Sequence, residues 1–119
     1  MEILYSLGER QFGENRDQEG AEKAAALSED VIWHYQGEIQ SQKIRSIVAW
    51  SDFIHSLDEL RHAKKIDTAA AELGKIQNVF LQINLDPEPG IRGGINPIEI
   101  DETVGEILAL RNLRLVGVM

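Results

Sequence analysis

The sequence contains no cysteine among its 119 residues. Disulfides, thiolate catalysis and cysteine-based metal sites are therefore excluded. The chain also lacks any apolar run near the roughly 20 residues of a membrane-spanning helix. Met1-Glu2-Ile3 does not begin a secretory signal peptide. We therefore expect a cytoplasmic protein.

Positive charge is scarce, because 12 lysines and arginines face 20 aspartates and glutamates, for a net charge of -8. Phosphate backbones and anionic membranes are bound by basic faces, so we expect neither nucleic acid nor a membrane as a partner. Hydrophobic residues make up 43% and charged residues 27% of the chain. These values are typical of a globular protein, and we expect one domain over residues 1–119.

Several motifs of catalysis and metal binding are also missing. The chain has no Gly-x-Gly-x-x-Gly and no P-loop, because Gly90 to Gly94 is not followed by Lys-Ser or Lys-Thr. His34, His55 and His62 have no spacing that matches a metal motif. We expect His62 to face solvent on a helix. The sequence therefore contains none of these motifs from which a particular reaction could be predicted.

What the sequence does contain is an alternation of strand-like and helix-like segments. A short helix ending at Gly8 comes first, and a capping box of Ser56 and Glu59 starts a later helix. The alternation predicts right-handed βαβ units and a parallel sheet, an α/β fold with about five parallel strands and four to five helices. The expected strands are 11–13, 31–36, 53–55, 78–85 and 113–119, and the main helices are 16–27, 43–50, 57–73 and 101–110.

The turn after the first strand, Phe12 to Asn15, has the features of a binding loop. Asn15 is expected to cap the following helix, with Gln18 reaching back to it. Such strand-to-helix turns lie at the carboxyl ends of parallel strands, where α/β proteins bind ligands. A well-capped loop without a ligand is the alternative.

Polar residues interrupt the strands near their carboxyl ends. Parallel strands that are buried on both faces should be almost continuously apolar. On the strand 78–85, Phe80, Gln82 and Asn84 share one face because side chains alternate. The pattern predicts a pocket on the side of the sheet away from the helices, although each residue alone could simply satisfy a backbone group. The interrupting residues are His34, Gln36, His55, Ser56, Gln82 and Asn84.

Taken together, these segments resemble the pyridoxal-phosphate homeostasis proteins, which are related in fold to the amino-terminal barrel of alanine racemase. The order and gaps of the segments agree over essentially the whole chain. The matching segments are Phe12 to Asn15 with Gln18-Glu19, Trp33-His34 with Gly37, Gln40 and Lys43, Ile54 to Ser56 with Asp58, Leu81 to Asn84, Gly93 to Ile95 and Leu115 to Met119.

The resemblance implies a partial (β/α)8 TIM-type barrel that binds pyridoxal 5′-phosphate and serves cofactor homeostasis rather than turnover. It implies no catalytic residue and no metal ligand in this chain. By position, it places Asn15 and Asn84 as polar neighbours of the cofactor ring and His34 and Met119 as pocket wall. Ser56 would lie at the same mouth.

The resemblance also implies that parts of the binding site are missing. The family's Schiff-base lysine would lie upstream of Met1, and the phosphate-binding loops beyond Met119. Arg92 stands where many relatives have lysine, and arginine stays protonated and forms no imine. We therefore expect an incomplete chain with impaired cofactor binding. The chain's own lysines are expected on helices or helix ends, facing away from the mouth: Lys23, Lys43, Lys64, Lys65 and Lys75.

Two alternatives remain open. The chain could be a fragment of a racemase-like enzyme, which would need a general acid or base that no tyrosine or cysteine evidently supplies. It could also be a non-catalytic module that associates with itself through the two open edges of its sheet.

Overall fold

The computed structural model describes residues 2–85 and 94–119. Within them, five strands form one parallel sheet in the order β1-β2-β3-β4-β5, which confirms the expected fold class. The elements are α1 Glu2–Ser6, β1 Gln11–Glu14, α2 Asp17–Ala26, β2 Ile32–Tyr35, η1 Ser41–Lys43, α3 Ile44–Trp50, β3 Phe53–Leu57, α4 Leu60–Glu72, β4 Gln77–Leu81, η2 Pro97–Glu99, α5 Ile100–Leu108 and β5 Leu113–Val118.

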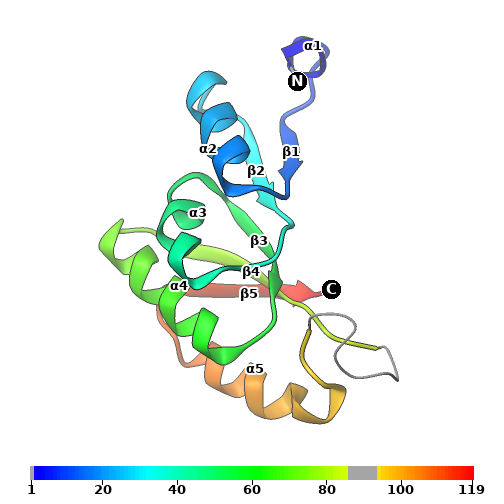
Figure 1. Cartoon of the computed structure of the whole chain (residues 1–119), viewed down its shortest axis with the longest axis vertical. Coiled ribbons are helices and arrows are strands. Elements are labelled where there is room, and N and C mark those ends of the chain that lie inside the picture. The colour runs from blue at the N-terminus through cyan, green and yellow to red at the C-terminus, as the bar shows by residue number, and fades with distance from the viewer. Residues whose placement is uncertain (1, 86–93) are drawn as a thin grey trace.

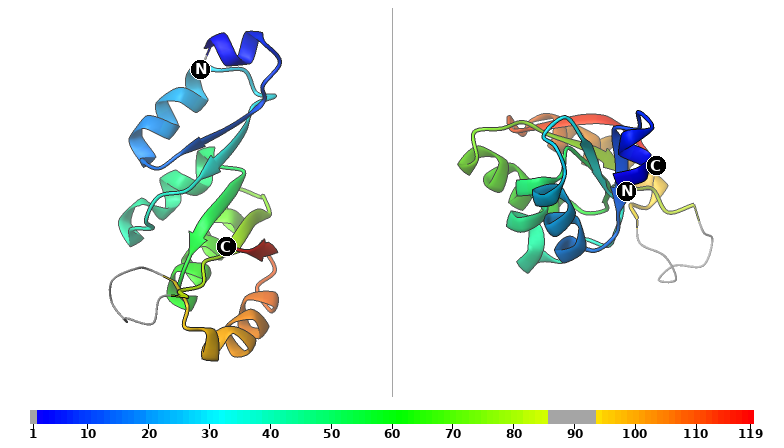
Figure 2. Two further views of the ribbon diagram at one scale, coloured as in Figure 1. Left: turned by 90° about the vertical axis from the view of Figure 1, so that its right-hand side faces the viewer. Right: turned by 90° about the horizontal axis from the view of Figure 1, so that it is seen from above.

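Helices α2 to α5 follow one another along one side of the sheet (Figures 1 and 2). Strand residues that point toward the helices, such as Trp33, Ile54 and Val79, are buried. Residues that alternate with them are half-buried or exposed, because no helix within the described residues covers the other side. We call this second side the inner face and define it by His34, Phe53, His55 and Phe80.

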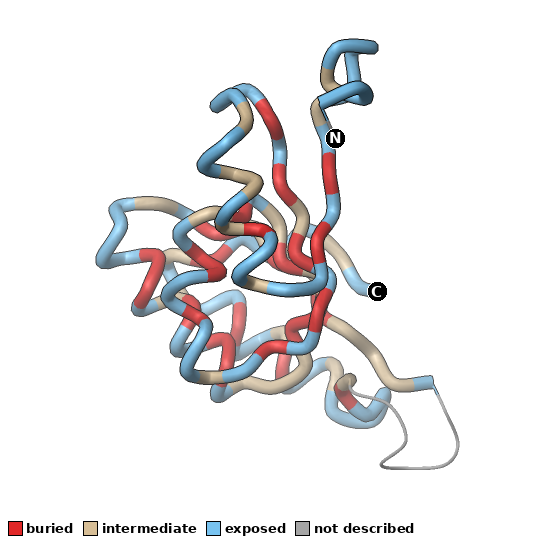
Figure 3. Tube along the Cα trace, turned by 45° about the horizontal axis from the view of Figure 1, so that its top comes forward, coloured by how far each residue is buried: buried red, intermediate tan, exposed pale blue. Residues whose placement is uncertain are grey.

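The main core lies between the helices and the sheet, where Figure 3 shows most of the buried positions. On α4, Ala63, Ile66 and Ala70 are fully buried, which confirms the predicted helical spacing. Leu57 belongs to β3 rather than to this helix, and Leu73 is exposed just after its end. Helix α1, in contrast, buries none of its residues.

Two irregularities in strand pairing bend the sheet. The register shifts between Ile54 and Leu57 where β3 pairs with β4, and again between Val79 and Phe80 where β4 pairs with β5. Bulges of this kind increase the local twist of a sheet. The result is a curved parallel sheet with helices on one side, as in a section of a (β/α)8 barrel (Figure 2).

Both predicted helix caps are wrong. Helix α2 begins at Asp17, and the residue before it, Arg16, rather than Asn15, holds the cap position without a side-chain bond. Asp17 instead accepts hydrogen bonds from Ser46 and Trp50 of α3, so it ties two helices together. Helix α4 begins after Glu59, which also makes no capping bond, while Ser56 belongs to β3.

The strand expected over 78–85 is shorter than predicted. Strand β4 ends at Leu81, and beyond it Ile83 forms an isolated bridge with Ile95. Residues 86–93, which include Arg92, lie outside the described residues. No helix of the described part is long and apolar enough to cross a membrane.

Candidate functional site

The five predicted site residues all lie at or near the carboxyl ends of successive strands. Asn15 directly follows β1, and Met119 directly follows β5. His34 and Ser56 are each the last residue but one of their strands, and Asn84 lies three residues beyond β4. Because the strands are parallel, these positions share one edge of the sheet.

At the β1–β2 end of this edge, the loops approach each other very closely. A Cβ on Gly37 would lie 2.2 Å from the Asn15 carbonyl oxygen, so only glycine fits there. The Ser56 hydroxyl donates to the Gly37 carbonyl and is buried. Ser56 therefore supports the loop beside Asn15 with its hydroxyl, while the Asn15 residue itself is exposed.

At the β4–β5 end, backbone hydrogen bonds hold Asn84 and Met119 on neighbouring segments. The Ile83 N–H donates to the Met119 carbonyl over 2.8 Å, and the Asn84 N–H donates to the Ile95 carbonyl over 2.9 Å. Gly94 has a φ of +126° and passes so close to Asn84 that a Cβ would lie 2.6 Å from its nitrogen. Glycine therefore lets the returning chain lie against Asn84.

A chain of hydrogen bonds runs across the inner face from β1 to β3. Gln11 Oε1 lies 3.0 Å from His34 Nε2, and His34 Nδ1 lies 2.8 Å from His55 Nε2. The His34 ring stacks on Phe53 at 4.8 Å between ring centroids, and the His55 ring stacks on Phe80 at 4.5 Å. The polar ends of β2 and β3 predict both histidines near the pocket, but not their direct contact.

Both histidines favour the neutral form. Burial lowers the pKa of His34, partly offset by the charge of Asp52. Burial also lowers the pKa of His55, and the neighbouring His34 adds to this effect. Since the Gln11 oxygen can only accept, we assign the proton of His34 to Nε2 and the proton between the rings to His55 Nε2.

None of the five lysines, all of which lie in the described residues, belongs to a strand. Lys23 Nζ lies 2.5 Å from the buried carboxylate of Glu14, and this hydrogen bond raises the pKa of Lys23. Lys75 Nζ donates to the carbonyls of Val48 and Ser51, and burial lowers its pKa. The other three, Lys43, Lys64 and Lys65, are exposed on helices.

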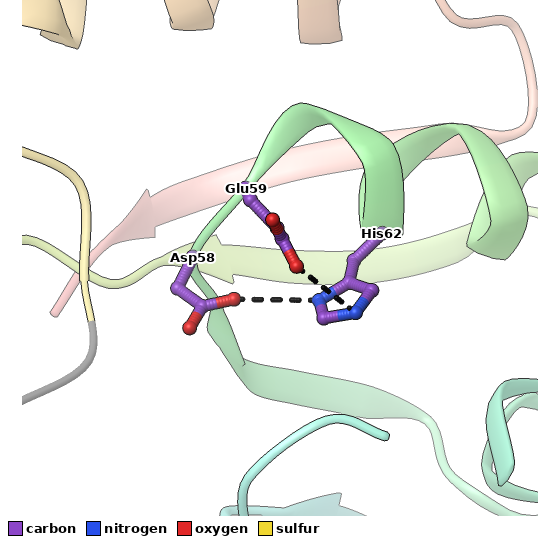
Figure 4. A group of neighbouring side chains, drawn as sticks. All are labelled: Asp58, Glu59 and His62. Carbon is purple, nitrogen blue, oxygen red and sulfur yellow. Dashed lines mark hydrogen bonds and ion pairs between the residues drawn. The ribbon is translucent and has the colours of Figure 1, made fainter. Parts of the chain in front are cut away.

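The expectation that His62 faces solvent is wrong, because the residue is 6% exposed. Figure 4 shows it between two carboxylates: His62 Nδ1 lies 3.4 Å from Asp58, and Nε2 lies 3.1 Å from Glu59. Arg61 also donates to Glu59, over 3.1 Å. Hydrogen bonds and ion pairs thus account for this cluster of side chains without a metal ion. Its carboxylate and imidazole groups are also of the kinds that bind metal cations. The spacing of Asp58 and His62, one helical turn, is the signal that the sequence offered.

A polar cleft of about 570 Å³ opens beside Asn15 at the start of α2. Its lining mixes cations and anions, among them Arg16, Glu38 and Lys43. The Tyr35 hydroxyl at its wall donates to the Glu38 carbonyl over 2.7 Å. The cleft lies between the start of α2 and the loop that leads from β2 to η1.

The whole chain, residues 1–119, matches the model of a protein family described as alanine racemase, N-terminal domain. The chain belongs to this family. The assignment agrees with the resemblance found in the sequence and with the partial barrel seen in the structure.

Curated relatives with similar sequences are pyridoxal phosphate homeostasis proteins. The protein from Synechocystis sp. is 37% identical over 121 residues, covering 100% of this chain and 55% of the relative. The protein from Escherichia coli K12 is 39% identical over 117 residues, covering 94% of this chain and 49% of the relative. The chain thus spans about half the length of the curated relatives it matches.

Solved structures show the same arrangement. PipY of Synechococcus elongatus with pyridoxal phosphate bound has a TM-score of 0.89 at 34% identity, covering 99% of this chain and 56% of PipY. Without the cofactor, PipY gives a TM-score of 0.92 at 36% identity, covering 99% of this chain and 55% of PipY. Alanine racemase of Clostridium difficile, with a TM-score of 0.77 at 19% identity over 98% of this chain and 30% of that enzyme, shares the fold.

Proposed function

We propose that this chain forms part of a pyridoxal 5′-phosphate-binding barrel that serves cofactor homeostasis in the cytoplasm. The observation that carries the proposal is the close agreement with cofactor-bound PipY over nearly the whole chain. The curated relatives named pyridoxal phosphate homeostasis proteins support the same function. We treat residues 1–119 as one cofactor-binding unit.

The residues at the carboxyl edge fit such a cofactor. Asn15 and Asn84 offer amides to the polar substituents of the pyridine ring, and His34 and Met119 form walls beside it. Ser56 holds the Gly37 loop in place through its buried hydroxyl. When bound, pyridoxal phosphate supplies an aldehyde that reacts with amines.

The positions of the lysines favour weak, non-covalent binding by this chain. Lys23 and Lys75 are engaged by Glu14 and by backbone carbonyls, respectively. The remaining three project from η1 and α4. None therefore stands on the inner face to bind the aldehyde, and the chain's contribution is to orient the ring and shield it from water.

The proposal predicts that Asn84→Ala weakens binding of pyridoxal phosphate about fivefold to tenfold, the loss of one hydrogen bond. Asn112→Ala is the matched control, because Asn112 lies just before β5, at the opposite edge of the sheet. Affinity is measured by absorbance titration of the whole chain. Equal affinities of the two variants would contradict the assignment of Asn84.

A second measurement addresses covalent attachment. Borohydride treatment of the chain with pyridoxal phosphate, followed by peptide mass spectrometry, should show no single lysine modified in stoichiometric amount. Stoichiometric modification of one lysine, for example Lys75 with its lowered pKa, would overturn non-covalent binding.

A further inference from the structure

A groove between helices α3 and α4 combines an apolar floor with a basic rim. It has a volume of about 390 Å³. Ile44 and Ala69 form its floor and are only 2% and 4% exposed. Arg45, Lys64 and Lys65 stand on its rim. We call it the α3–α4 groove.

The positive charge of the α3–α4 groove is only partly neutralised. Arg45 forms an ion pair with Glu72 across the groove. Lys64 and Lys65 are exposed and make no ion pair with any described residue. Two adjacent free cations are notable in a chain whose net charge is -8.

The groove is independent of the proposed cofactor site. All its lining residues come from η1, α3 and α4, which pack against one another within the described chain. These helices lie on the side of the sheet opposite the inner face (Figure 2). An occupant of the groove would therefore leave the carboxyl edge and the inner face accessible.

We propose that the α3–α4 groove docks an acidic, amphipathic segment of a partner protein. Apolar side chains of the segment lie on the aliphatic stems of Arg45, Lys64 and Lys65, and its carboxylates pair with the ammonium groups of the two lysines. Charge complementarity carries the choice of occupant, since the free charges of the groove are positive. Nucleic acid fits less well, because a phosphate backbone has no apolar side chains to cover the apolar part of this groove.

The test uses the ¹⁵N-labelled full chain and a synthetic peptide with leucine at helical spacing and glutamate elsewhere. Amide shifts should map to α3 and α4, and K64E/K65E should weaken binding about tenfold. The matched control is R111E/R114E, which makes the same charge change at exposed arginines outside the groove. It should alter the affinity by no more than about twofold, through long-range charge alone.

Several results would overturn the proposal. They include amide shifts outside α3 and α4, equal losses of affinity in the two double variants, and equal binding of a peptide that carries lysine in place of glutamate. Stronger binding of duplex DNA at the same amides would also overturn it, in favour of a nucleic acid partner. If K64E/K65E does not fold, K64A/K65A replaces it, with an expected loss of about threefold.

Discussion

The contact between His34 and His55 joins two rings whose pKa values are both lowered from the ordinary value of 6.5. A nitrogen–nitrogen distance of 2.8 Å leaves room for one proton between them, and burial disfavours charge on either ring. Burial therefore disfavours the first added charge, and the contact itself is lost when both facing nitrogens carry a proton. The pH dependence of stability therefore reports on the contact between these two rings on the inner face.

Acidification should destabilise the chain through this pair. The pKa of each ring is lowered from 6.5 in the folded chain, so the unfolded chain binds more protons as the pH falls through that value. The free energy of unfolding, measured with urea, should therefore be lower at about pH 5.5 than at about pH 7.5, and the loss grows until the folded rings protonate. The H34F/H55F variant keeps the ring stacking and should show a smaller difference. An unchanged difference would show that the rings do not contribute.

Single residues also mark where sequence reasoning fails. The carboxyl-end positions of Asn15, His34 and Asn84 could be predicted because strands and turns have local signatures. The use of Asp17 by Ser46 and Trp50 of α3 could not, because these partners are distant from Asp17 in the sequence. The cofactor-binding roles of the predicted residues stay predictions.

At the scale of elements, two helical glycines have opposite surroundings. A Cβ on Gly20 of α2 would lie 2.3 Å from the ring of Trp50 on α3. A Cβ on Gly105 of α5 would meet nothing within 4 Å. The first glycine permits close helix packing, and the second only adds backbone freedom to the unfolded chain.

These glycines give a matched pair of variants. Gly20→Ala should lower the free energy of unfolding by about 1–3 kcal/mol, because α2 must move away from Trp50. Gly105→Ala should raise it by about 0.5–1 kcal/mol, the helical preference of alanine over glycine. Urea unfolding of both variants measures the difference. Similar changes in the two variants would show that α2 does not pack on Trp50 as described.

The order of strands and helices could be predicted, because apolar residues recur at every second position in strands and at every third or fourth position in helices. The helix starts were not, since Ser56 and Asn15 have the residue types of caps but other surroundings. Ser56 bonds the Gly37 carbonyl from within β3, a contact that no local pattern reveals. Contacts between segments distant in the sequence, rather than local capping preference, therefore determine the roles of these two residues.

At the scale of the whole molecule, the sheet has two unpaired edges. In the described residues, β1 pairs only with β2, and β5 only with β4. The inner face also leaves Phe53 and Phe80 half-buried. Open strand edges and half-covered apolar faces both favour association between chains.

We predict that the chain associates with itself as its concentration rises. Analytical ultracentrifugation should show the mean mass increasing with concentration. Val118→Lys places a charge on the edge strand β5 and should reduce the association. Leu108→Lys, at a residue of α5 that is 68% exposed, is the control and should have little effect. A monomer at all concentrations that unfolds cooperatively would contradict the prediction.

We propose that the carboxyl edge of this sheet binds pyridoxal 5′-phosphate. The most direct measurement is an NMR titration of the labelled chain with the cofactor, followed at backbone amides and histidine rings. We predict shifts at Asn15, His34, Asn84 and Met119, with Asn112 at the opposite edge unchanged. No shift at the carboxyl edge, or larger shifts at the lysine-bearing helices, would contradict the account.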